Sequence, residues 1–162
     1  MDFDRVRELF DYDPITGIVT RRKTTAPMWK FGQIVGCPDR HGYLLVRVDG
    51  VLHKLHRMIW LWMTGELPIL DIDHVDRDGS NNSWENLREA TKSQNLSNRT
   101  KQSNNTSGFK GVSWNKQNSK WAAKINVEGR QLHLGFRDTP VECYRLYVDA
   151  ARKYVGEFAR VS

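Results

Sequence analysis

The stretch Asp71-Ile72-Asp73-His74-Val75-Asp76 surrounds one histidine with three carboxylates, and it is the most distinctive pattern in the first half of the chain. A single histidine is most often a satisfied polar or core residue, and Asp/Asn runs usually form turns in which side chains bond their own backbone. Asp78-Gly79-Ser80-Asn81 is expected to be such a turn. Further asparagines follow at Asn82, Asn86, Asn95 and Asn98. Because Asn is a poor helix former, those in the helix-compatible stretch 84–98 need another explanation.

Asp73, His74, Asn86 and Asn95 supply the donor groups that hydrolysis of a phosphodiester requires. The intervals from His74 to Asn86 and from Asn86 to Asn95 are twelve and nine residues. Carboxylate and amide oxygens are hard ligands that suit Mg²⁺ or Mn²⁺. A neutral imidazole beside such a cation can take a proton from water. The combination therefore predicts metal-assisted phosphodiester hydrolysis.

The residues before this stretch predict short helices and strands. The Asp49-Gly50 pair between two β-rich runs indicates a hairpin. Gly65 is placed to end the helix that follows this hairpin. The expected elements are a helix at 3–10, a strand entered from a turn at 15–20, strands at 41–48 and 51–55, a helix at 56–64, and a loop on a short strand at 71–83.

Part of the chain resembles the HNH endonuclease family, especially the HNH nucleases of phages and mobile introns. The matching motifs are His56-Arg57, Asp73-His74-Val75-Asp76, Asn82, Asn86-Leu87-Arg88 and Gln94-Asn95. The resemblance implies a ββα-metal motif: two strands, a loop and a helix around one divalent cation. It implies that Asp73 and Asn95 bind this cation and that His74 is the general base. It also implies that Asn86 braces the loop and orients His74.

The chain departs from the family pattern at two points. Asn95 stands at the last motif position, where a histidine is the alternative, and the phage subset resembles that choice. Cys37 and Cys143 lie far apart without a CxxC pair, which excludes a cysteine zinc finger and a disulfide framework.

The roles of His56, Arg57 and Arg88, which lie near the motif, are open. His56 either buttresses the site or touches a phosphate, or it simply begins the helix at 56–64. Arg57 and Arg88 are candidate phosphate contacts, although a solvated arginine is the commoner outcome.

Positive charge is concentrated in one central block. The chain has 25 Lys+Arg and 19 Asp+Glu, a net charge of +6. Residues 1–91 hold 12 basic and 14 acidic residues, whereas residues 92–137 hold nine basic residues and one acidic residue. A block of one sign is typical of polyanion binders, although a solvated surface is the alternative.

Three strands and one helix are expected in the last part of the chain, at 109–114, 120–128, 130–136 and 139–156. Thr139 is placed to cap the helix, and Pro140 suits its first position. Alternation puts Leu132, Leu134 and Phe136 on one apolar face that would pack on the helix. The opposite face is polar and cationic, so it is either a solvated surface or a surface that enters a major groove.

This part resembles an AP2 DNA-binding domain, in which three strands pack on one helix and the sheet enters the major groove. The matching stretches are 107–112, 120–125, 132–136 and 139–142, together with Tyr147 and Ala150-Ala151. Plant relatives carry several arginines where this chain has Lys, Ser, Asn, Gln and His, so no target sequence is implied. The residues that the resemblance turns toward DNA are Lys110, Ser113, Asn115, Lys124, Asn126, Gln131 and His133.

The sequence thus predicts an α+β protein with three parts. These are a ββα-metal HNH module with an N-terminal β-rich extension at 1–98, a polar linker at 99–106, and an AP2-like three-stranded antiparallel sheet packed on one helix at 107–162. The predicted activity is Mg²⁺- or Mn²⁺-dependent cleavage of double-stranded DNA at a site selected by the AP2-like part, with a monomer favoured. The alternatives are a sequence-specific DNA-binding regulator with an inactive HNH part and an RNA-binding or ribosome-associated protein.

A cytoplasmic location without membrane contact is expected. No apolar stretch approaches the ~18 residues of a membrane span, and the acidic N-terminus has no apolar signal segment.

Overall fold

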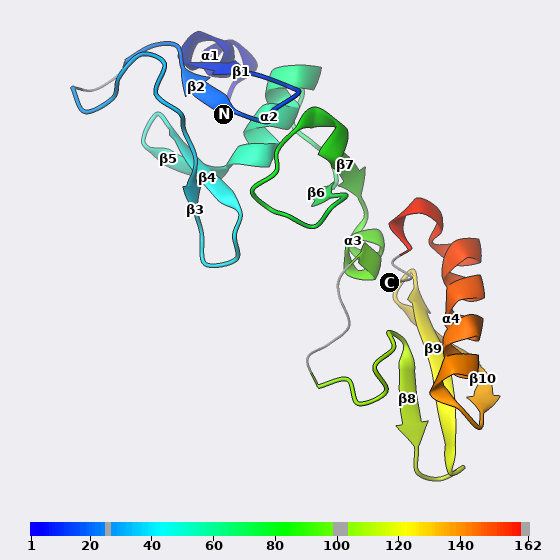
Figure 1. Cartoon of the computed structure of the whole chain (residues 1–162). Helices are drawn as coiled ribbons and strands as arrows, with labels where there is room; N and C mark the ends of the chain where they lie inside the picture. Colours follow the sequence, from blue (N-terminus) through cyan, green and yellow to red (C-terminus); the bar gives the residue numbers. More distant parts are fainter. Residues whose placement is uncertain (25–26, 99–103, 160–162) are drawn as a thin grey trace. The chain divides into compact units, whose positions relative to one another are not determined.

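Two compact units, Met1–Ala90 and Thr91–Ser162, make up the chain. The computed structural model describes residues 1–24, 27–98 and 104–159 (Figure 1). The units divide before the predicted linker at 99–106, of which residues 99–103 lie outside the described residues. The linker therefore stays a prediction. Within the described ranges, no helix is long and apolar enough to cross a membrane.

The first unit combines two helices with short antiparallel sheets. The sheets are β1-β2, β3-β4-β5 and β6-β7 (Figure 1). Its elements are α1 (Phe3–Leu9), β1 (Phe10–Tyr12), β2 (Val19–Arg21), β3 (Cys37–Pro38), β4 (Leu44–Val48), β5 (Val51–Lys54), α2 (Leu55–Thr64), β6 (Asp71–His74), the 3-10 helix η1 (Trp84–Asn86) and β7 (Leu87–Ala90).

The predicted hairpin and the predicted end of α2 are both confirmed. Val48 pairs with Val51 across the turn. Asp49 and Gly50 have φ angles of 46° and 84°, the positive values that a type I′ turn requires. Gly65 ends α2 in the left-handed conformation, with φ 82°.

The helix-compatible interpretation of residues 84–98 is wrong for the first half of that stretch. Residues 87–90 form strand β7, which pairs with β6 from Leu87 opposite His74 to Ala90 opposite Asp71. Leu87 and Ala90 are both buried and lie three residues apart, a spacing that a helix face also produces. So short an apolar pattern cannot distinguish the two elements, and pairing with β6 decides between them.

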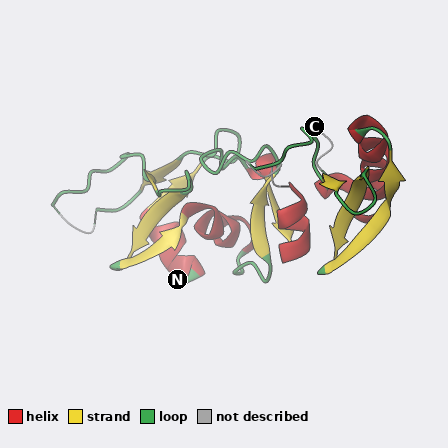
Figure 2. Ribbon diagram, turned by 90° about the horizontal axis from the view of Figure 1, so that it is seen from below, coloured by secondary structure: helices red, strands yellow, loops and turns green. Residues whose placement is uncertain are grey.

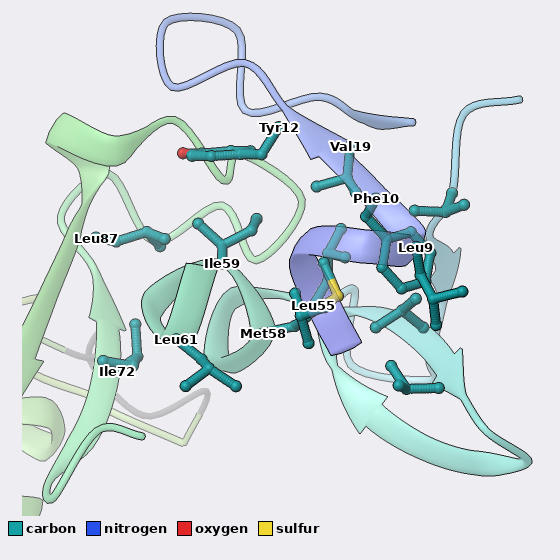
Figure 3. Close-up of a cluster of buried hydrophobic side chains, with 14 residues drawn as sticks. Leu9, Phe10, Tyr12, Val19, Leu55, Met58, Ile59, Leu61, Ile72 and Leu87 are labelled. Carbon is teal, nitrogen blue, oxygen red and sulfur yellow. The ribbon is translucent and has the colours of Figure 1, made fainter. Parts of the chain in front are cut away.

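One hydrophobic core holds the first unit together. Its members come from both helices and from five of the strands, and Figure 3 shows Ile72 and Leu87 of the β6–β7 hairpin in the same cluster as Leu55 and Ile59 of α2. Removing one buried Leu or Ile side chain from such a core typically costs about 2–5 kcal/mol. The N-terminal residues therefore form a structural part of the unit that carries His74. The buried members are Val6, Leu9, Phe10, Tyr12, Val19, Val35, Val46, Val48, Leu55, Met58, Ile59, Leu61, Ile72 and Leu87.

The second unit is a three-stranded antiparallel sheet with helices. The strand order is β10-β9-β8, and α4 packs on one sheet face through Ile125 and Tyr147 (Figures 1 and 2). The predicted cap is confirmed, because Thr139 and Glu142 form a reciprocal capping box at the start of α4. The elements are α3 (Lys92–Asn98), β8 (Val112–Asn115), β9 (Lys120–Val127), β10 (Arg130–Arg137), α4 (Pro140–Tyr154) and the 3-10 helix η2 (Gly156–Phe158).

The prediction that Leu132, Leu134 and Phe136 share one face is wrong for Phe136. The register shifts between His133 and Gly135, which is a β-bulge. A bulge adds one residue to a strand and reverses the alternation beyond it. Leu132 and Leu134 pack toward α4, whereas the Phe136 ring lies 4.4 Å from the His133 ring, centroid to centroid. An aromatic ring therefore lies on the outer face of the sheet.

Candidate active site

His74 is the last residue of β6 and is only 4% exposed. Its Nε2 lies 3.1 Å from Oδ1 of Asn82. The Asn82 amide nitrogen donates to the carbonyl of Ser80 at 3.2 Å, which fixes the amide so that its oxygen faces the imidazole. An amide oxygen only accepts hydrogen bonds, so Nε2 is the donor in this contact.

The loop that carries Asn82 is held by the N-terminal part of the chain. The Tyr12 hydroxyl donates to the Asn82 carbonyl at 2.9 Å. Gly17 has φ +73°, and a Cβ there would lie 2.5 Å from the Asn82 carbonyl carbon and 2.4 Å from the Ser83 nitrogen. A side chain at this position would therefore displace the loop. The sequence analysis gave Tyr12 and Gly17 no role, because nothing local links them to residues some 70 positions away.

Asn86 spans the loop between β6 and η1. Its amide nitrogen donates to Asp76 Oδ1 at 2.9 Å and to the Asn81 carbonyl at 2.7 Å. Its amide oxygen accepts from the Asp76 nitrogen at 2.9 Å. Burial alone would raise the pKa of the Asp76 carboxyl, but hydrogen bonds from Asp78, Asn81 and Asn86 hold this pKa below its usual value. Asn86 thus closes the loop, while the amide oxygen that orients the His74 ring belongs to Asn82.

The rings of His56 and Tyr43 pack against the His74 ring. The His56 ring lies 5.2 Å from the His74 ring at an interplanar angle of 81°, and the Tyr43 ring lies 5.7 Å from it. His56 is 7% exposed, and its Nδ1 has no hydrogen-bond partner in the described part of the chain. Burial, followed by the charge of His74, lowers the pKa of His56 to about 3, so this ring is neutral at physiological pH. Of the roles left open for His56, the structure shows direct packing against His74.

Asp73 and Arg88 form a buried ion pair across the hairpin. They are directly opposite in the register, and Asp73 Oδ2 lies 3.0 Å from both Nε and Nη2 of Arg88. Neighbouring side chains leave opposite faces of a strand, so Asp73 shares one face with Arg88 and His74 shares the other with Leu87. Both predicted site residues lie at the end of β6.

Arg57 fixes the chain that leads into β6. Its guanidinium donates to the carbonyls of Pro68 and Leu70 at 3.2 and 3.3 Å. These bonds give Arg57 a structural function, and its contact with a phosphate stays a prediction.

Asn95, the second predicted metal ligand, belongs to α3 and hence to the second unit. There the Ser93 hydroxyl accepts from the Glu128 nitrogen at 3.2 Å, and the Ser97 carbonyl accepts from Lys110 Nζ. Since Asp73 belongs to the first unit and Asn95 to the second, their joint role as ligands stays a prediction.

The donor chemistry of Asp73 fits a divalent cation. Among the described residues, no group of three or more His, Cys, Asp or Glu side chains could hold a metal ion. The proposed ligand pair of Asp73 and Asn95 has one carboxylate and one amide oxygen, so it is not a group of this kind. Hard oxygen donors are what Mg²⁺ requires. Asp73 is 5% exposed, and a buried carboxylate needs a positive partner, either a guanidinium or a cation.

The outer face of the second unit gathers most of the residues predicted to face DNA. Cross-strand pairs join His133 to Lys124 and Gln131 to Asn126 on the face opposite α4. Lys110 lies apart from this face, because it precedes β8 and bonds to α3. The residues that share the outer face are Ser113, Asn115, Lys124, Asn126, Gln131 and His133.

Comparison with known proteins gives the family of the chain. Residues 53–97 match a family model described as HNH endonuclease, and the matched range contains Asp73, His74, Asn86 and Asn95. The chain is 34% identical over 108 residues to protein 3.8 of Escherichia phage T7, an alignment that covers 66% of this chain and 88% of that protein. The chain belongs to the family of T7 protein 3.8 and carries an HNH endonuclease domain.

A solved structure offers a further comparison for this HNH protein. The chain aligns with the HNH homing endonuclease I-HmuI, in a structure that describes DNA binding and cleavage by that enzyme. The alignment covers 96% of this chain and 90% of the I-HmuI chain. The TM-score is 0.46 and the sequence identity is 20%.

Proposed function

We propose that this HNH protein is a metal-dependent DNA endonuclease in which His74 is the general base. The observation that carries the proposal is the hydrogen bond between His74 Nε2 and Asn82 Oδ1, formed by a buried imidazole inside the HNH domain. In the proposed mechanism the His74 ring is held by this bond through Nε2 while it takes the proton of an attacking water. Asn86 and Tyr12 keep the loop that carries Asn82 in place.

His56 and Tyr43 position the base. The edge-to-face contact with His56 and the tilted contact with Tyr43 restrict the orientation of the His74 imidazole. Because burial lowers the pKa of His56 to about 3, this ring adds no positive charge beside His74 at physiological pH.

Asp73 and Asn95 would hold Mg²⁺ or Mn²⁺, with Asp73 providing the anionic charge. When bound, the cation offsets negative charge on the scissile phosphate and on the leaving oxygen. Arg88 orients the Asp73 carboxylate through its Nε and Nη2, and a phosphate contact of Arg88 would add to this role.

The second unit supplies affinity and site choice. Its outer face carries lysine, histidine and amide side chains on adjacent strands, which supports the proposal of an AP2-like DNA-binding surface. Such side chains read base edges in a major groove. A tethered second module raises the local concentration of the nuclease at its site without new contacts in the active site.

The direct test is cleavage of plasmid DNA by the full chain with Mg²⁺. We expect cleavage in Mg²⁺ and its loss in excess EDTA. Cleavage that proceeds in EDTA would overturn the metal requirement. Binding of duplex DNA without any cleavage would favour the regulator with an inactive HNH part, and preferential competition by RNA would favour an RNA-binding protein.

Replacing both Lys124 and Asn126 with alanine is expected to shift or blur the preferred cleavage site. Both side chains leave the outer sheet face, and one lost base contact is worth about 1–3 kcal/mol of discrimination. The cleavage rate at saturating DNA should not change. Mapping of cleavage sites on a genomic DNA library measures the effect.

The matched control is Lys153→Ala, which removes one positive charge from an exposed position of α4 instead of from the sheet face. It should leave the preferred site unchanged. If the Lys124/Asn126 double variant cuts the parental site with parental preference, the sheet face is not the part that selects the site.

A further inference from the structure

A cavity of about 350 Å³ lies in the first unit, and none of its lining residues belongs to the candidate active site. It is bordered by α1, by the end of β2, and by the turn between β4 and β5. Its lining consists of Arg5, Arg21, Trp29, Arg47, Asp49 and Gly50.

Arg21 is the unusual member of this lining, because it is an arginine that is only 4% exposed. Its backbone is fixed on both sides: its nitrogen donates to the Gln33 carbonyl at 2.9 Å, and its carbonyl accepts from the Gly32 nitrogen at 2.8 Å. Its guanidinium carbon lies 4.0 Å from the centroid of the Trp29 ring and 5.4 Å from that of Phe10. The side chain is therefore held between two aromatic rings.

The Arg21 guanidinium has neither an ion pair nor a hydrogen bond with any described residue, and its buried Nε is without a partner. Burial lowers the pKa of this guanidinium below its usual value. A buried charge is costly unless an opposite charge or hydrogen-bond acceptors compensate it. Stacking on Trp29 satisfies none of the five N–H donors of an arginine.

The remaining charges of the cavity leave an excess of positive charge. Asp49, its one carboxylate, accepts from Nε and Nη2 of Arg5 at 2.9 and 2.7 Å. The Arg5 guanidinium accordingly lowers the pKa of Asp49. Arg47 donates to the Gly50 carbonyl at 2.5 Å, a neutral acceptor that leaves its charge uncompensated. Arg5 Nη1 also lies 2.6 Å from Glu8 Oε2, so Arg5 is paired with two carboxylates and the uncompensated charge of the cavity belongs to Arg21 and Arg47.

We propose that this cavity binds a phosphate group, with Arg21 as its direct contact and Arg47 as a second source of positive charge. The planar fork of a guanidinium matches the geometry of phosphate oxygens. The phosphate comes from the backbone of a DNA strand or from free inorganic phosphate. Binding of a DNA backbone phosphate rests on the proposed function as a DNA endonuclease. Such a site would hold DNA to the first unit independently of the sheet face of the second.

The test replaces Arg21 with methionine in the full chain. Inorganic phosphate, compared with chloride at equal ionic strength, should raise the melting temperature of the parental protein and not that of Arg21→Met. In EDTA, where DNA binding is measured without cleavage, the log–log salt slope of duplex affinity should fall by about one for the lost phosphate contact.

Two further variants keep the test decisive. Arg22→Met removes the same charge from the next residue, which is ion-paired to Asp11 at 3.8 Å and does not line the cavity. This control should retain the full phosphate response. Arg21→Lys keeps the charge without the planar fork and should show a reduced response, so it carries the test if Arg21→Met does not fold.

Each outcome decides between sources or overturns the proposal. A lost phosphate response with an unchanged DNA slope assigns the site to free phosphate, and a reduced DNA slope assigns it to the DNA backbone. If the Arg21 variants keep the parental phosphate response and DNA slope, Arg21 is a structural residue and the proposal is wrong. Because both readouts are made without catalysis, failure of the proposed nuclease activity leaves them interpretable.

Discussion

His74→Ala should lower the rate of DNA cleavage by about 10²–10⁴-fold, the usual loss when a general base is removed. The imidazole is buried at the end of β6 and has no binding role in the proposed mechanism, so affinity for duplex DNA should stay near the parental value. Single-turnover cleavage in Mg²⁺ measures the rate, and duplex binding in EDTA measures the affinity.

Two other substitutions separate chemistry from folding in that experiment. Asn82→Ala removes the amide oxygen from Nε2 while leaving the base in place, so it should reduce the rate less than His74→Ala does. His53→Ala is the control, because His53 lies in β5 and makes none of the ring contacts of His74. A His74→Ala protein that cuts at the parental rate would show that His74 is not the base.

The local patterns of the sequence were sufficient for much of the fold. Asp49-Gly50 predicted the hairpin, and Thr139 with Pro140 predicted the start of α4, because turn and cap chemistry depends on adjacent residues. Asp73, His74 and Asn86 were selected as candidate site residues from their donor groups and their spacing, and the structure places Asp73 and His74 at the end of one strand and Asn86 across the loop that follows.

The parts that the sequence did not predict depend on contacts between distant residues. Strand β7 forms because it pairs with β6, and Phe136 changes face because of a bulge that alternation does not reveal. His56 and Tyr43 reach His74 only through the packing of α2 and the loop before β4. Arg21 likewise became notable only once its burial was known.

Asp73→Asn should abolish most cleavage in Mg²⁺, because the change removes the one anionic donor of the proposed ligand pair while keeping the shape of the side chain. Asn95→Ala removes one neutral oxygen and should lose less, with partial recovery in higher concentrations of Mn²⁺. Metal affinity, measured by calorimetric titration of the full chain, should fall more for Asp73→Asn than for Asn95→Ala.

Asp73 also stabilises the fold, so the ligand role must be separated from the ion pair with Arg88. Breaking a buried ion pair costs on the order of 3–5 kcal/mol, and the Asp73 and Arg88 side chains are 6% and 17% exposed. The matched comparison is Arg88→Met, which breaks the same pair but keeps the carboxylate: it should lower the unfolding free energy and reduce metal affinity less than Asp73→Asn does. If Asp73→Asn binds the metal as tightly as the parental protein, Asp73 is a structural partner of Arg88, and the charge that holds a cation must come from another residue.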